Sequence, residues 1–170
     1  MDEKLVIKTA GLKNEQEITN LFQRSYATLM KETYVPDVLS EVLPKMTTAN
    51  PKLLSSNKFY FISLEENQIV SCGGWSMEKP GEQTIIPGTA HIRHFATDPN
   101  WIRKGFGRMI YEKCEKDARL EGVHSIECYS SINAERFYSS LGFEKIEKIE
   151  IPFGPNVSFP VIFMRKKISD

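Results

Sequence analysis

The residues whose types and spacing best suit chemistry lie at positions 97–108, where a predicted strand leads into a predicted helix. This segment carries Gly105 and Gly107 among three cations. The first N–H groups of a helix lack internal partners and lie at the positive end of the helix dipole, so consecutive amides there can bind an anion. Glycine lets the anion approach the backbone closely. The segment therefore predicts a phosphate or diphosphate site.

Two familiar phosphate loops do not fit these residues. A Walker A loop ends in Gly-Lys-Ser/Thr, whereas Gly107 is followed by Arg108 and Met109. A dinucleotide fingerprint needs a third glycine where Ile110 stands and an acidic residue after the next strand, where the chain has Tyr129. Both loops are therefore disfavoured, and an ordinary helix start stays open as an alternative for the Gly-x-Gly pattern taken alone.

The composition argues against several other functions. The chain has 170 residues, which fits one domain, and its 22 lysines and arginines balance 22 aspartates and glutamates. No basic excess points to nucleic acid, and no stretch approaches the ~20 apolar residues that cross a membrane. Residues 1–8 lack the apolar core of a signal peptide. We therefore expect a cytoplasmic domain over residues 1–170, with neither nucleic acid nor a membrane as partner.

The three cysteines, Cys72, Cys114 and Cys128, form an odd and widely spaced set without a CxxC pair. Neither a disulfide framework nor a zinc site is indicated by such spacing. They are expected to be buried thiols in a reducing compartment, and no metal is expected.

The elements that must position the glycine segment can be read from the apolar patterns. Strands are predicted at residues 4–9, 58–64, 69–77, 89–97, 125–129, 143–151 and 159–166; helices at 14–31, from Pro36 to Asn50-Pro51, from Gly105 to Gly122, and from a cap at Asn133 to Gly142. Gly73 and Gly74 inside a strand indicate a bulge or a close backbone approach. Together these elements predict one twisted sheet with helices on both faces.

Two segments resemble the signature of the GNAT family, the Gcn5-related N-acetyltransferases. Residues 89–121 combine a strand, an acidic-proline turn, a basic Gly-x-Gly and an amphipathic helix, and residues 133–143 are similar to the family's Asn-to-Leu-Gly-Phe segment. The resemblance covers the whole chain in element order and is specific across residues 89–143. It differs at Ile102, where the family often has glutamine or arginine. The resemblance implies a single-domain α/β GNAT-like fold with a mixed, mostly antiparallel sheet.

The resemblance also implies acetyl-CoA as cosubstrate and assigns residues to it. The diphosphate would bind the backbone at Arg103, Lys104, Gly105, Phe106, Gly107 and Arg108. The pantetheine arm would lie along Phe95, Ala96 and Thr97 and meet Asn133. Tyr138 falls where many members have a tyrosine that protonates the departing thiolate. Homodimers are common in the family.

The implied reaction transfers the acetyl group to a primary amine of a small molecule or a protein, and it needs a base. An alkylammonium with a pKa of ~10.4 leaves only about one molecule in a few thousand neutral at pH 7. His91, directly or through water, is the candidate base, because histidine titrates near neutral pH. The serotonin acetyltransferase branch of the family has two histidines on this strand. His91 matches the first, and this chain has Arg93 at the position of the second. A backbone N–H near Phe95 to Thr97 would stabilise the oxyanion.

Alternatives stay open for these assignments. Core packing is an alternative for Tyr138, a helix cap for Asn133 and a structural role for His91. A CoA-binding or acyl-CoA-binding sensor without catalysis is the competing function, and a transferase of longer acyl chains is a third. The acceptor cleft is expected between the loops at residues 78–87 and 152–156. Candidates to line it are Tyr34, Trp75 and Phe153.

Overall fold

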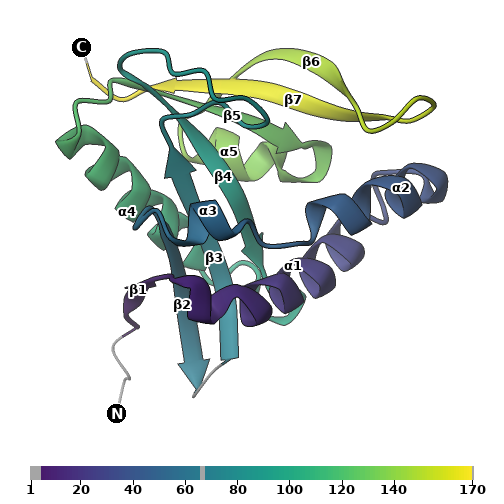
Figure 1. Cartoon of the computed structure of the whole chain (residues 1–170), viewed down its shortest axis with the longest axis horizontal. Helices are drawn as coiled ribbons and strands as arrows, with labels where there is room; N and C mark the ends of the chain where they lie inside the picture. Colours follow the sequence, from purple (N-terminus) through teal and green to yellow (C-terminus); the bar gives the residue numbers. More distant parts are fainter. Residues whose placement is uncertain (1–4, 66–67, 170) are drawn as a thin grey trace.

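The computed structural model describes residues 5–65 and 68–169, and within them seven strands form one sheet (Figure 1). The strands are β1 (Ile7–Thr9), β2 (Phe59–Glu65), β3 (Gln68–Ser76), β4 (Thr89–Thr97), β5 (Ser125–Ser131), β6 (Glu144–Pro152) and β7 (Ser158–Lys167). Their order across the sheet is β1-β2-β3-β4-β5-β7-β6. Neighbouring strands are antiparallel except β4 and β5, which are parallel.

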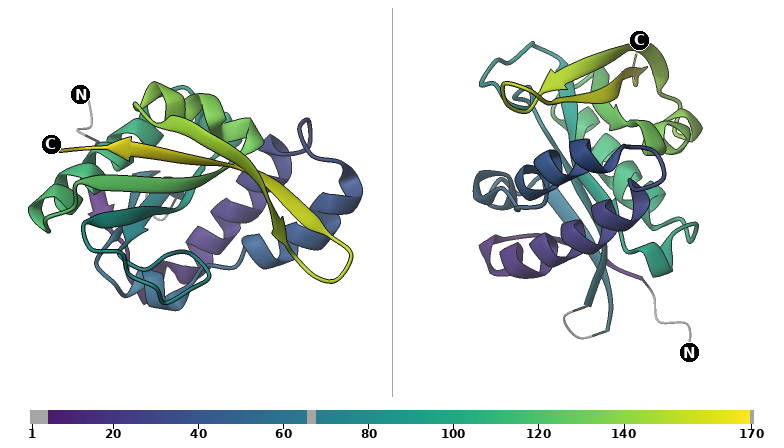
Figure 2. Two further views of the ribbon diagram at one scale, coloured as in Figure 1. Left: turned by 90° about the horizontal axis from the view of Figure 1, so that it is seen from above. Right: turned by 90° about the vertical axis from the view of Figure 1, so that its right-hand side faces the viewer.

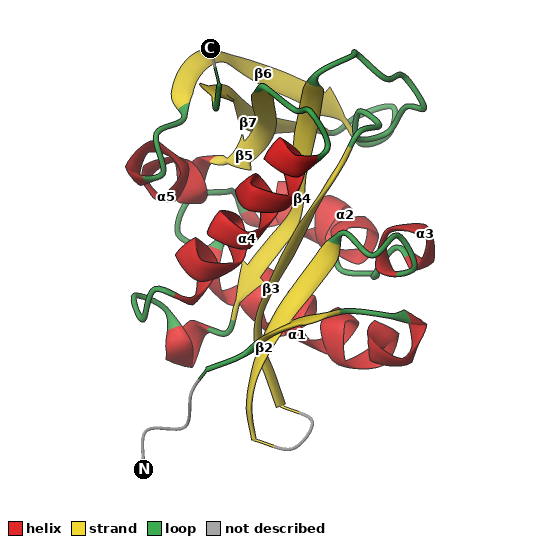
Figure 3. Ribbon diagram, turned by 90° about the vertical axis from the view of Figure 1, so that its left-hand side faces the viewer, coloured by secondary structure: helices red, strands yellow, loops and turns green. Residues whose placement is uncertain are grey.

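Helices cover both faces of this sheet. They are α1 (Glu15–Leu29), α2 (Pro36–Met46), α3 (Pro51–Leu54), α4 (Phe106–Leu120) and α5 (Glu135–Ser140), with short 3-10 turns η1 (Leu12–Asn14), η2 (Pro99–Trp101) and η3 (Ile132–Ala134). The first three α-helices lie on one face, and α4 and α5 lie on the other (Figures 1 and 3). The predicted fold class is confirmed. None of the helices in the described ranges is long and apolar enough to cross a membrane.

The apolar run in β2 explains why both faces are covered. Phe59 and Phe61 pack in the core beside α1, α2 and α3, whereas Tyr60 and Ile62 pack in the core beside α4. Successive strand residues point to opposite faces, so a strand buried on both sides has no polar alternation. The long β6–β7 hairpin extends over α2 (Figure 2). There the Lys45 ammonium donates to the Phe153 carbonyl oxygen at 2.8 Å.

The three cysteines, Cys72, Cys114 and Cys128, are all buried in these cores as free thiols. Burial raises the pKa of each thiol, because the thiolate would lose its hydration. The prediction of buried cysteines is confirmed, and each behaves as a small apolar side chain.

Two helix boundaries differ from the prediction. Helix α2 ends at Met46, and Pro51 begins a separate short helix that Asn50 caps through its side chain. Proline suits this place because the missing N–H would have no helical partner. The predicted cap at Asn133 is wrong: this residue lies inside η3, and Ala134 occupies the position before α5 without a side-chain cap. A 3-10 turn thus extends this helix backwards and moves its start.

An ion pair fixes the turn that follows β4. The Arg24 guanidinium of α1 donates to the Asp98 carboxylate at 2.7 Å and to the Ile69 carbonyl oxygen at 2.8 Å. Asp98 also accepts the Asn100 N–H at 2.9 Å, and its own N–H donates to Val70 at 2.8 Å. Burial raises the pKa of Asp98, but the hydrogen bonds from Arg24 and Asn100 outweigh it, so the pKa is lowered overall. The carboxylate therefore joins α1, β3 and the turn before α4.

We predict that Asp98→Asn lowers the free energy of unfolding by about 1.5–3 kcal/mol at pH 7, the value typical of a hydrogen bond to a charged group. The folded pKa lies below the unfolded one, so this stability is present above the unfolded pKa of about 3.9 and is lost as the pH falls through the folded pKa. Urea denaturation from pH 7 to pH 3 measures it. The exposed Glu147→Gln is the matched control. A difference between Asp98→Asn and wild type that does not shrink in acid would refute the assignment.

Candidate active site

Two cavities of similar size meet inside the molecule. The α4 cavity, of about 470 Å³, lies between α1, the end of β4, the start of α4 and α5. The β6–β7 cavity, of about 460 Å³, lies between α1, the middle of β4, the loop after β3 and the β6–β7 hairpin. The two cavities share six of their lining residues: Tyr26, Met30, Phe95, Ser131, Ala134 and Tyr138. Two molecules held in the two cavities could therefore touch at this shared wall.

The cavities meet where β4 separates from β5. The two strands pair only from Thr89 to His91, opposite Ser125 to Glu127. Both strands continue, β4 to Thr97 and β5 to Ser131, but no further pairs join them. The edge of β4 beyond His91 therefore has no strand beside it in the described part of the chain, and its backbone groups on that side are available to a ligand.

A bulge in β4 lies next to this point. Cys72 pairs with Ala96 and Gly74 pairs with Arg93, so β4 has one residue more than β3 over this interval. His94 lies inside the interval with a left-handed φ of 52°. Such a φ is uncommon for a residue with a side chain and marks a bent strand. The bulge breaks the simple alternation, so neighbouring β4 side chains turn towards the same cavity.

The backbone on either side of Phe95 is held in place from behind. The Tyr26 hydroxyl donates to the Phe95 carbonyl oxygen at 3.0 Å, and the Ser71 hydroxyl donates to that of Ala96 at 3.4 Å. A side chain at Gly73 would place its Cβ 2.5 Å from the Phe95 ring, so only glycine fits there. The predicted bulge or close approach at Gly73 and Gly74 is confirmed, and the absence of a side chain at Gly73 leaves room for the Phe95 ring.

The start of α4 forms one end of the α4 cavity. Gly105 is the cap residue, with φ at 82°, and a Cβ built on it would have no atom within 4 Å. The first turn of α4 carries no acidic residue, so the positive end of the helix is not neutralised locally. The predicted anion-binding residues Arg103, Gly105, Phe106, Gly107 and Arg108 line this cavity, whereas Lys104 does not.

The other residues predicted to hold the cosubstrate line the same cavity. Phe95, Ala96 and Thr97 come from the free edge of β4, and Asn133 comes from η3. Ile102, the position where the sequence differs from the GNAT pattern, also lines it. The end of β4, η3 and the start of α4 thus all border the α4 cavity.

Tyr138 lies at the junction of the two cavities, and only 7% of its surface is exposed. Its ring packs edge-on against Phe95, Phe137 and Phe143, with ring centroids 6.4, 5.0 and 5.7 Å away. Burial, followed by the nearby Cys128, raises the pKa of Tyr138 well above its usual value. The hydroxyl therefore keeps its proton at neutral pH and can donate it at the junction.

His91 lies apart from this junction. It is 1% exposed and lines neither cavity. Its ring nitrogens have no hydrogen-bond partner in the described chain. Nδ1 is 4.0 Å from Oε1 of Glu127, and the other oxygen of this carboxylate, Oε2, forms an ion pair with Arg165 at 2.7 Å. Burial lowers the pKa of His91, although Glu127 opposes this. The structure does not bring His91 together with the other predicted site residues.

Three β4 residues that were not predicted for the site line the β6–β7 cavity: Ile92, Arg93 and His94. Arg93 and His94 both face the β6–β7 cavity, which strict alternation along β4 would forbid. Burial, with the neighbouring Arg93 cation, lowers the pKa of His94 to about 4, so its imidazole is neutral at pH 7. The paired glycines at positions 73–74 were the available signal, because they indicated the bulge that turns these side chains.

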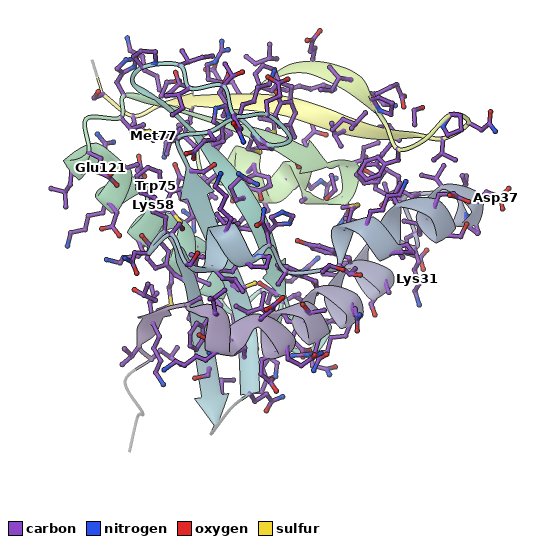
Figure 4. All side chains as sticks on the ribbon, viewed as in Figure 1. Lys31, Asp37, Lys58, Trp75, Met77 and Glu121 are labelled. Atoms are coloured by element: carbon purple, nitrogen blue, oxygen red, sulfur yellow. The ribbon has the colours of Figure 1, made fainter. Side chains whose placement is uncertain are left out.

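The loops predicted to border a cleft contribute Lys79, Glu82 and Phe153 to the β6–β7 cavity. Trp75 and Tyr34 line neither cavity. Trp75 is fully buried, and the Lys58 ammonium lies 4.7 Å from its ring centroid (Figure 4). Tyr34 is buried as well, and its hydroxyl accepts the Ile132 N–H at 2.8 Å and donates to the Pro160 carbonyl oxygen at 2.7 Å. Both residues belong to the structural core.

Comparison with known proteins gives a consistent result. A family model described as "Acetyltransferase (GNAT) domain" matches residues 14–152. The chain is also similar to the GCN5-related N-acetyltransferase "Aminotransferase, Class-II" from Rhodopseudomonas palustris, with a TM-score of 0.77 and 13% identity over 97% of this chain and 96% of that one. No curated protein sequence matches the chain.

Two further solved structures share the fold. The PaiA N-acetyltransferase from Thermoplasma acidophilum, solved in complex with coenzyme A, has a TM-score of 0.70 and 14% identity over 96% of this chain and 99% of that one. The ribosomal-protein-S18-alanine N-acetyltransferase from Escherichia coli has a TM-score of 0.65 and 16% identity over 98% and 96%. At such identities the likeness concerns the fold alone.

Proposed function

The chain belongs to the GNAT family of acetyltransferases, and we propose that it transfers the acetyl group of acetyl-CoA to a primary amine of a small molecule or a protein. The observation that carries this proposal is the meeting of the two cavities at Tyr138. One cavity would hold the acyl donor and the other the acceptor, so that the thioester and the amine meet at the shared wall. Holding two reactants in this way supplies much of the acceleration in such reactions.

We assign the donor to the α4 cavity. The diphosphate would accept hydrogen bonds from the first N–H groups of α4, where the open space at Gly105 and the absence of acidic residues in the first turn support an anion. Arg103 and Arg108 line this end and would add charge, while Lys104 would act from outside the cavity. The structure of the Thermoplasma acidophilum relative in complex with coenzyme A supports the class of ligand.

The pantetheine arm would follow the free edge of β4. Phe95, Ala96 and Thr97 lie beyond the last β4–β5 pair, so their outward backbone groups can bond to an extended ligand as a neighbouring strand would. Asn133, which makes no cap, offers an amide from the opposite wall. A backbone N–H near the bulge would stabilise the oxyanion, and the bonds from Tyr26 and Ser71 that hold the neighbouring carbonyls support its fixed direction.

The proton transfers involve two different groups. Tyr138 would protonate the departing thiolate, because its hydroxyl is protonated at neutral pH and the residue lies where the two cavities meet. The acceptor ammonium must lose its proton before attack, and it would release the proton to solvent through the β6–β7 cavity, which is partly open. His91 lines neither cavity, so direct transfer to it is not part of the proposal, and transfer through water stays a prediction.

Calorimetric titration of the purified protein with acetyl-CoA and with CoA, followed by a thiol-release assay with mixed amines, tests the function. We expect saturable binding of both nucleotides and release of free thiol that depends on an amine. Binding without thiol release from a broad amine panel would favour the competing function, a CoA sensor. No binding of either nucleotide would overturn both.

We predict that Tyr138→Phe lowers kcat by about 100-fold, a typical contribution of general acid catalysis, with acetyl-CoA affinity nearly unchanged. The hydroxyl acts mainly as the thiolate forms, so its loss affects the transition state more than the ground state. Tyr111→Phe is the control, because Tyr111 is equally buried on α4, lines neither cavity and lacks a hydroxyl partner in the described chain. A kcat for Tyr138→Phe equal to that of the control would remove Tyr138 from the mechanism.

We predict that Gly105→Asp weakens CoA binding by about 10-fold or more, or 1.4 kcal/mol, because it places a carboxylate where the diphosphate would bind. Gly122→Asp is the matched control: Gly122 follows the other end of α4, has φ at 83° and equally open surroundings, and so creates similar backbone strain. Calorimetry on both variants separates the effect of a negative charge at the start of α4 from the effect of backbone strain. Equal affinities for the two variants would place the diphosphate elsewhere.

A further inference from the structure

The β6–β7 cavity contains a cation that the protein does not pair with an acid. Arg93 is half-buried on β4 and lines this cavity, and its Nη1 donates to the Ser76 hydroxyl at 2.9 Å. Within residues 5–65 and 68–169, no carboxylate lies within ion-pair distance of it. Lys79, the other cation on this wall, forms an ion pair with Glu82 at 3.6 Å.

The electrostatics of the cavity are therefore set by Arg93. Burial lowers the pKa of its guanidinium, and the nearby Glu78 opposes this from beyond ion-pair distance. His94 on the same wall is neutral at pH 7 because its pKa is about 4. Lys79 and Glu82 offset each other. A guanidinium withdrawn from water without an acid is unfavourable, and its planar donors suit a carboxylate bonded through both oxygens.

Most of the remaining cavity wall is apolar, and part of it is aromatic. Its residues include Met46, Tyr129, Ile151, Phe153 and Phe159. Such a wall would take the body of a ligand that is apolar or aromatic, with Arg93 as the polar anchor that has no acid partner in the described chain.

We infer that the acceptor is a free amino acid with an apolar or aromatic side chain, whose carboxylate binds Arg93 while its amine faces Tyr138. This inference rests on the proposed function. Arg93, Phe95 and Tyr138 all line this cavity, and the bulge at His94 lies between the first two. An α-amino acid carries its amine and its carboxylate on one carbon, so a carboxylate bound at Arg93 would keep the amine within the same cavity, on the side where Phe95 and Tyr138 lie.

The inference separates free amino acids from the amines of peptides and proteins. A protein N-terminus has an amide in place of the α-carboxylate and would leave the Arg93 guanidinium without its partner. Simple alkylamines and arylalkylamines would leave it unpaired as well.

The experiment compares phenylalanine, leucine and methionine with their primary amides and with the matching decarboxylated amines. For each compound, kcat/KM is measured by thiol release, and binding in the presence of CoA is measured by calorimetry. We expect wild type to prefer the amino acid over its amide by about 10-fold to 100-fold, as for a charged hydrogen-bonded pair. The ratio of kcat/KM for the amino acid to that for its amide, measured on one preparation, does not depend on the fraction of folded protein.

Arg93→Met should abolish this preference, and Arg93→Lys should keep part of it, because lysine retains the charge but not the paired donors. Lys79→Gln tests the other cation on the wall. If the preference disappears with Lys79→Gln and persists in Arg93→Met, the assignment to Arg93 is wrong. Wild-type protein that acetylates amides or decarboxylated amines as well as amino acids would overturn the inference while the proposed function stands.

The binding measurement separates the two failures. Preferential binding of the amino acid that depends on Arg93, but without thiol release, would keep the carboxylate site and reject the transferase. Binding of no amino acid from the panel, with turnover of other amines, would reject the carboxylate site alone.

Discussion

The short pairing of β4 with β5 is the constraint on which the rest of the structure depends. These are the only parallel neighbours in the described sheet, and they share three residue pairs before they separate. The separation leaves the outer half of β4 without a neighbouring strand, and both cavities open along it. A fully paired β4 would satisfy its backbone within the sheet and leave nothing for a ligand to bond. The candidate site thus lies where the sheet leaves one strand edge unpaired.

An open sheet needs support from both faces, and the two cores supply it. One core packs under α1, α2 and α3 and the other under α4 and α5, so β3 and β4 are held from both sides (Figure 3). The ion pair between Arg24 and Asp98 adds a polar link from α1 to the turn before α4. Tyr26, also on α1, holds the Phe95 carbonyl. Helix α1 therefore helps to hold both the bulge in β4 and the turn before α4 in place.

The polar groups of the site are arranged by charge. The start of α4 is the positive end of the helix and borders the α4 cavity. Arg93 borders the β6–β7 cavity and has no acidic partner in the described chain. Between them, Tyr138 is neutral and surrounded by aromatic rings. Burial raises the pKa of Tyr138 and lowers that of His94, so both stay uncharged at neutral pH. Such an order suits a donor and an acceptor that each carry negative charge away from the reacting atoms.

Local sequence determined the parts of this protein that depend on neighbouring residues. The helix start at Gly105, the order of strands and helices, and the special role of Gly73 and Gly74 follow from backbone freedom and side-chain period, which act over a few positions. Only the tertiary structure decided that Asn133 lines a cavity instead of capping a helix, that His91 is enclosed beside Glu127, and that Arg93 faces the second cavity. Those outcomes depend on where β4 leaves β5 and on the bulge that shifts its alternation, and both are set by packing between segments distant in the chain.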